Sequence, residues 1–179
     1  GNAVRFVKKV RRACSTSATR MLAGLCAQVP DTTEVVAVES AFADYRTYFY
    51  NGKEVDQQVH LGFDLARLAG NPIVAANAGK VVVADELGIY GNTVILDHGM
   101  GVQSLYAHLS SFDVKAGDTV HKEQTLGRSG MTGLAGGDHL HFTMLISGRM
   151  VNPVEWWDAH WIEDRILRKL RAAGAGSGS

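Results

Sequence analysis

Short runs of apolar residues, several of them alternating with polar ones, occupy the chain from about residue 35 to residue 145. Alternation has the period of a half-buried β-strand, because successive side chains of a strand point to opposite faces. Glycine turns separate the runs. The middle of the chain is therefore predicted to be mainly β, with strands at 80–84 (KVVVA), 92–96 (NTVIL), 103–109 (QSLYAHL) and 139–146 (HLHFTMLI).

A different pattern marks the two ends of the chain. Val4, Val7 and Val10 have helical spacing, so residues 1–34 are predicted to be a basic, helical segment. After Pro153, a helical pattern predicts a C-terminal helix over 155–173, with its tryptophans packing against the domain. Residues 174–179 (GAGSGS) are expected to be a flexible linker-like tail, and any native targeting segment or anchor is expected to lie outside this sequence.

Charge is balanced over the whole chain but not along it. Lys and Arg total 18, as do Asp and Glu, so no general affinity for nucleic acid is expected. Residues 1–30 carry basic and no acidic side chains, as in a segment beside a membrane anchor or on the solvated face of a helix. No apolar stretch approaches the roughly 18 residues of a membrane helix. Cys14 and Cys26 fit either a short-loop disulfide or two free thiols.

The histidines carry the chemical signal. In the strand at 139–146, alternation places His139 and His141 on the face opposite Leu140, Phe142 and Met144. The apolar side chains favour the core, so the two imidazoles are expected to project together on the other side.

Two more segments have the same pattern. Residues 60–65 (HLGFDL) place His60 and Asp64 opposite three apolar residues, and residues 105–109 (LYAHL) place His108 with Tyr106 opposite Leu105 and its partners. A single histidine on a strand is usually a surface or packing residue, and a His-x-His pair is weak evidence. Three segments with one pattern favour a shared cleft, provided that the strands are neighbours.

Two imidazoles and one carboxylate form a three-ligand set for catalytic zinc that leaves a position for water. Zinc lowers the pKa of that water to about 7, and a nearby neutral histidine can accept its proton. The spacing alone leaves open which histidines bind metal. His98, His121 and His160 show no comparable pattern and are interpreted as structural or surface residues.

The sequence resembles the lysostaphin-type, or LytM-like, zinc endopeptidases of bacterial cell walls. The resemblance covers roughly residues 40–153, in the order and at the spacing typical of the family. It rests on residues 60–64 (HLGFD), 88–99 (GIYGNTVILDHG), 105–110 (LYAHLS), 114–120 (VKAGDTV), 127–133 (GRSGMTG), 137–142 (GDHLHF) and 151–153 (VNP).

The resemblance implies a mostly antiparallel β domain over residues 35–154, with an open groove and flanking helices. It implies one zinc ion per chain held by His60, Asp64 and His141, with His108 and His139 as catalytic histidines that do not bind the metal. The substrate would be the peptide stems and cross-links of peptidoglycan, and the location would be the bacterial envelope, in the periplasm if the source is Gram-negative. Which bond is cut stays open.

Three further positions are candidates near the site. Arg46 and Asn92 are predicted to contact substrate, with a surface ion pair and a strand start as their alternatives. Asp138 stands where the family commonly has proline, and we expect it to end a turn rather than to touch the metal ligands.

Two rival functions remain. Some relatives have lost metal ligands and only activate cell-wall amidases, so a non-catalytic envelope protein that binds peptidoglycan is the first alternative. The complete set of five residues argues against it. The second alternative is a biotinyl or lipoyl carrier, suggested by the hairpin-like run 114–127, but no Met-Lys pair supports it.

Overall fold

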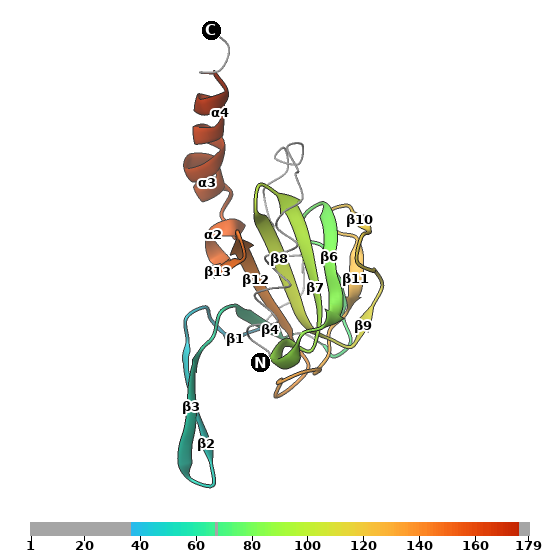
Figure 1. The fold of residues 1–179 in the computed structure, drawn as a ribbon, viewed down its shortest axis with the longest axis vertical. Helices are drawn as coiled ribbons and strands as arrows, with labels where there is room; N and C mark the ends of the chain where they lie inside the picture. The colour runs from blue at the N-terminus through green and yellow to red at the C-terminus, as the bar shows by residue number, and fades with distance from the viewer. Residues whose placement is uncertain (1–36, 67, 176–179) are drawn as a thin grey trace.

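The computed structural model describes residues 37–66 and 68–175. The predicted N-terminal helix within residues 1–34, together with Cys14 and Cys26, lies outside the described residues. The described part is mostly antiparallel β-sheet, followed by helices at its C-terminal end (Figure 1). This confirms the predicted fold class, while the open groove stays a prediction.

The main sheet has eight strands, in the order β1-β4-β12-β8-β7-β6-β10, with β13 paired to the end of β12. All of its pairs are antiparallel. Strands from distant parts of the sequence, β4, β12 and β8, are therefore neighbours. The strands are β1 (Ala37–Ser40), β4 (Phe63–Ala66), β6 (Gly79–Glu86), β7 (Asn92–Gly99), β8 (Val102–Leu109), β10 (Thr119–Val120), β12 (Leu140–Ile146) and β13 (Arg149–Val151).

Two smaller sheets complete the β structure. One has the order β5-β11-β9, formed by β5 (Pro72–Val74), β11 (Thr125–Arg128) and β9 (Ser111–Phe112). The other is the hairpin of β2 (Tyr45–Tyr50) and β3 (Lys53–Val59), which projects away from the main sheet (Figure 1). A short 3-10 turn, η2 (Gly88–Tyr90), precedes β7.

Apolar side chains cover both faces of the main sheet. The larger cluster joins Phe142 and Met144 of β12 to Ile73 of β5 and Leu126 of β11, so the three-stranded sheet packs on this face. The smaller cluster lies on the opposite face and consists of Val83, Ile95, Leu105, Ala107 and Leu145. Because β12 alternates between these clusters, its histidine, His141, lies on the side of the smaller one, as predicted.

The C-terminal helical region differs from the single helix predicted over 155–173. It consists of α2 (Val154–Trp157), α3 (Ala159–Ile162), the π-helical turn η3 (Glu163–Leu167) and α4 (Arg168–Ala175). The break falls at Asp158, whose backbone is extended and whose carboxylate accepts hydrogen bonds from the backbone N–H groups of His160 and Trp161. An aspartate in this position begins a new helix, because its side chain satisfies N–H groups that lack a helical partner.

Buried side chains attach these helices to the sheet. Trp156 and Ile162 belong to the larger cluster, and Trp157 and Trp161 pack against it, as expected for tryptophans with a packing role. The helix α4 extends beyond the β domain (Figure 1) and includes the first two residues of the expected tail. Among the described residues, no helix has the length and hydropathy needed to span a membrane.

Candidate metal centre

The register of three adjacent strands brings the site together. In β12, His141 lies opposite Asp64 of β4 on one side and opposite Ala107 of β8 on the other. Asp64 and His141 are 77 residues apart in the sequence, so this row exists only because the two strands pair. His60 lies in the loop that leads from β3 into β4, four positions before Asp64.

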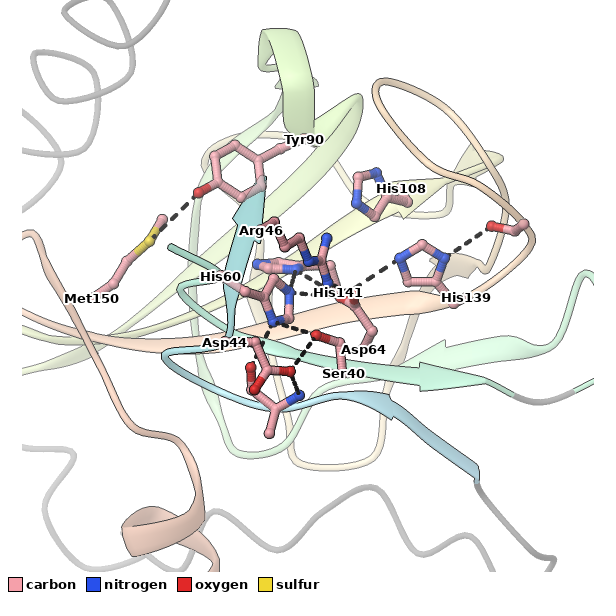
Figure 2. A network of polar contacts seen from close by, with 12 residues as sticks. Ser40, Asp44, Arg46, His60, Asp64, Tyr90, His108, His139, His141 and Met150 are labelled. Carbon is pink, nitrogen blue, oxygen red and sulfur yellow. Dashed lines mark hydrogen bonds and ion pairs between the residues drawn. The ribbon is translucent and has the colours of Figure 1, made fainter. Parts of the chain in front are cut away.

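Three donor atoms converge at this row. The His60 Nε2 atom lies 3.0 Å from Asp64 Oδ1 and 3.0 Å from His141 Nδ1, and the last two atoms are 2.9 Å apart. All three residues are buried, and they are the group among the described residues whose donor atoms could hold a metal ion. Figure 2 shows the three side chains pointing at one another.

The chemistry of this donor set fits a metal cation. The His60 Nδ1–H group donates to the carbonyl of Ala41 at 2.8 Å, so a neutral His60 presents a lone pair on Nε2. That lone pair faces the carboxylate oxygen of Asp64, which is also an acceptor. A tetrahedral ion with bonds of about 2.0–2.1 Å separates its ligand atoms by about 3.3 Å, close to the observed spacing.

A turn at residues 40–44 holds His60 in place. The backbone N–H of Ala43 donates to His60 C=O at 2.7 Å, and the His60 N–H donates to Asp44 C=O at 2.8 Å. The Asp44 carboxylate in turn accepts from Ser40 Oγ–H and from the backbone N–H of Ala41. The turn therefore sets both the position of His60 and the tautomer of its ring. Sequence analysis did not find this support, although Ser and Asp at a spacing of four are typical of such turns.

Arg46 contacts the site through a metal-ligand candidate. Its guanidinium donates to Asp64 Oδ2 at 2.8 Å, while Oδ1 faces the two imidazoles. The Arg46 side chain is 38% exposed, and that of Asp64 only 7%. Burial by itself would raise the pKa of Asp64, but its polar contacts with His141 and with the Arg46 guanidinium outweigh burial and hold the pKa of this carboxyl well below its ordinary value. Asp64 is consequently a carboxylate at any ordinary pH.

The other two predicted histidines lie beside the triad. The ring centroids of His108 and His139 are 4.8 Å apart, and that of His108 is 5.8 Å from the centroid of His141. The His139 Nε2 atom is 3.6 Å from Asp64 Oδ1. Each of the two donates its Nδ1–H to a backbone carbonyl, His108 to Thr132 and His139 to Gly137. In the neutral rings, both Nε2 atoms therefore carry lone pairs.

His108 reaches the site by a route that alternation did not predict. The expectation placed it on the face of Tyr106 and opposite Ala107, but Tyr106 and Leu109 belong to the larger cluster and Ala107 to the smaller one. A bulge in the pairing of β7 with β8, with His108 at φ +61°, turns its side chain to the same face as Ala107. His108 thus lies beside the triad, but not for the geometric reason that alternation gave, and its catalytic role stays a prediction. Burial lowers the pKa of His108 to about 4.

The remaining candidates have different surroundings. Asn92 begins β7, and its backbone N–H donates to Thr132 Oγ1 at 2.9 Å. Asp138 accepts a hydrogen bond from the backbone N–H of Gly70, so its carboxylate ties two loops together. His98 is buried in the core, whereas His121 and His160 are exposed.

Two residues near His141 were missed by sequence analysis. Gly62 leaves space for the imidazole of His141, since a Cβ atom there would lie 2.5 Å from His141 Cε1 and Nε2. The ring of Tyr90 lies 5.3 Å from that of His141, centroid to centroid. The glycine is visible in the run HLGFD, but its role can be recognised only when the position of the neighbouring strand, which carries His141, is known.

A buried set of two imidazoles and one carboxylate, with two further imidazoles beside it, is the arrangement of a metal-dependent hydrolase. Residues 58–153 match the sequence profile of Peptidase family M23. The chain belongs to this family of metallopeptidases.

Relatives with curated names agree with this assignment. The chain is 40% identical over 97 residues to the DD-carboxypeptidase/endopeptidase Mpg of Neisseria meningitidis serogroup B, covering 54% of this chain and 22% of that protein. It is 38% identical over 96 residues to the peptidoglycan DD-endopeptidase ShyA of Vibrio cholerae, with coverages of 54% and 22%. The aligned regions thus span about a fifth of these longer relatives.

A solved structure agrees as well. The catalytic domain of the antimicrobial peptidase lysostaphin from Staphylococcus simulans superposes with a TM-score of 0.57 at 29% identity. The match covers 68% of this chain and 92% of that domain. The lysostaphin-type resemblance predicted from the sequence motifs is therefore confirmed.

Proposed function

We propose that this chain is a zinc-dependent endopeptidase that hydrolyses the peptide cross-links of bacterial peptidoglycan. The observation that carries the proposal is the convergence of His60 Nε2, Asp64 Oδ1 and His141 Nδ1 within 3.0 Å of one another. These three residues would hold one zinc ion per chain. When bound, zinc polarises a scissile carbonyl and makes a water molecule acidic enough to react near neutral pH.

His108 and His139 are proposed to handle the protons. Their Nδ1–H groups are engaged by backbone carbonyls, so the Nε2 atoms are the available bases. The lowered pKa of His108 keeps its ring neutral at pH 7. Either ring can accept a proton from the attacking water, and the resulting imidazolium can return it to the leaving amine.

Arg46 and Asn92 are proposed to contact the substrate peptide. Arg46 holds Asp64 with one nitrogen, and its exposed portion can donate to a substrate carbonyl or carboxylate. Asn92 is partly exposed at the start of β7, beside the loop that supports His108. We further propose a location in the bacterial envelope, in the periplasm, in keeping with the peptidoglycan-directed activity named for ShyA.

Digestion of purified peptidoglycan tests the function. Zinc-loaded protein should convert cross-linked dimers into monomers, identified by mass spectrometry, and a chelator should abolish the conversion. H141A should lose zinc and activity together, whereas H108A and H139A should keep most zinc and lose most activity. If H139A lost zinc and H141A kept it, the ligand assignment would be reversed. A zinc-loaded protein without any cleavage would favour the alternative of a non-catalytic peptidoglycan-binding or amidase-activating protein.

A further inference from the structure

The backbone at His108 is held in an uncommon conformation. Its φ angle of +61° lies in the left-handed region, which is unfavourable for a residue that carries a Cβ atom. Without this conformation, the alternation of β8 would direct His108 away from His141. Something in the surrounding structure must therefore hold both the bulge and the imidazole.

The side chain of Thr132 makes the contacts that do so. Its hydroxyl donates to the carbonyl of Leu109 at 2.8 Å and accepts from the backbone N–H of Asn92 at 2.9 Å. Asn92 and Leu109 are paired residues of β7 and β8, at the edge of the bulge that contains His108. The hydroxyl thus links both strands at the point where their register shifts.

The backbone of the same residue contacts the catalytic candidate. The carbonyl of Thr132 accepts a hydrogen bond from His108 Nδ1–H at 2.8 Å. Thr132 lies 24 residues after His108 in the sequence, yet it contacts both His108 and Leu109, the last residue of β8.

Close packing of two backbones keeps the loop at this distance. A Cβ atom on Gly91 would lie 2.3 Å from the Thr132 carbonyl carbon, and one on Gly133 would lie 2.3 Å from the Gly91 nitrogen. The backbone N–H of Leu134 also donates to Ile89 C=O at 2.8 Å. The loop at 130–134 therefore packs directly against the η2 turn. The glycines at this contact cannot be replaced without a steric clash, whereas the hydroxyl of Thr132 can be removed without one.

We propose that the Thr132 hydroxyl positions His108, fixing the left-handed bulge and the Nδ1–H tautomer through the Thr132 carbonyl. The inference rests on the proposed function for its catalytic consequence. Thr132 acts through His108 as a positioning residue. It touches none of the three metal-ligand candidates in the described structure.

Substitution by valine tests the proposal, because valine keeps the shape of threonine and removes the hydroxyl. T132V should bind zinc as the wild type does, and its kcat should fall about 10- to 100-fold, with KM changed by less than about twofold. T132S, which keeps the hydroxyl, should recover most of the lost rate. In the H108A background T132V should change kcat by less than about twofold. A wild-type kcat in T132V, or an equal loss with and without His108, overturns the proposal.

A spectroscopic measurement separates this inference from the proposed function. Nitrogen-15 NMR of the imidazoles in the zinc-loaded protein should show His108 as the Nδ1–H tautomer in the wild type and in T132S. In T132V the Nε2–H tautomer should become populated. If T132V fails to fold, T132A serves in both experiments. An unchanged tautomer overturns the proposal even if the protein cleaves peptidoglycan, and a changed one supports it even if no cleavage is found.

Discussion

The glycine at position 62 should be required for tight metal binding. A Cβ atom at this position would lie 2.5 Å from two atoms of the His141 ring and 2.8 Å from the carbonyl oxygen of Phe142. Ordinary van der Waals contact begins at 3.4 Å, so in G62A the ring or the loop must move by about 0.9 Å. The φ angle of Gly62 is outside the left-handed region, so it is space and not backbone conformation that excludes alanine.

The magnitude follows from the donor distances. His141 Nδ1 lies 2.9 and 3.0 Å from its two neighbouring donor atoms, and metal–ligand bonds tolerate deviations of about 0.2 Å. A displacement of 0.9 Å exceeds this tolerance several-fold. We expect a loss of about 10- to 100-fold in zinc affinity, the range that follows from disturbing the groups around metal ligands.

Competition with a zinc-sensitive chelating dye measures the affinity, and circular dichroism shows whether the fold is retained. G136A is the matched control, since a Cβ atom at Gly136 meets nothing within 4 Å. It should bind zinc as the wild type does. A folded G62A that bound zinc with unchanged affinity would refute the packing argument, and with it the placement of the His141 ring against this loop.

Two further predictions concern charge and pH. R46Q removes the partner of Asp64 Oδ2 and should weaken zinc binding about tenfold. R46K should have an intermediate zinc affinity, and R165Q, at an exposed position, should bind zinc as the wild type does. An unchanged zinc affinity in R46Q would show that Arg46 does not support the site. Burial lowers the pKa of His98 in the folded protein. Below about pH 6.5 the unfolded chain therefore binds a proton that the folded protein does not, and the free energy of unfolding decreases as the pH is lowered. Urea unfolding at pH 7.5 and 5.5 should show a smaller difference in H98Q than in the wild type or the exposed variant H121Q. An undiminished difference in H98Q would assign the effect to other groups.

The pKa values of two histidines bear on the pH range of the proposed activity. The proposed mechanism needs the ligand and base histidines to be neutral. Burial lowers the pKa of His108 to about 4 and also lowers that of His141. These two rings therefore stay neutral to lower pH than an exposed histidine would.

The sequence by itself determined which side chains are candidates and, for His141, which face of its strand it takes. In β12 the apolar residues Leu140, Phe142 and Met144 lie in the larger cluster, and His141 emerges on the opposite side, as alternation requires. The motifs were also sufficient to identify the family. Both results depend on neighbours in the sequence, because the pleat of a strand and the order of motifs are local or linear properties.

Only the tertiary structure decided how the candidates meet. The row that joins Asp64 to His141 depends on hydrogen bonds between strands far apart in the sequence, and no local pattern specifies that register. The bulge at His108, the space beside Gly62 and the ion pair of Arg46 with Asp64 arise the same way, from a neighbour that another part of the chain supplies. The alternation of apolar and polar residues shows which face of a strand is apolar, whereas strand pairing and packing determine which residues contact that face.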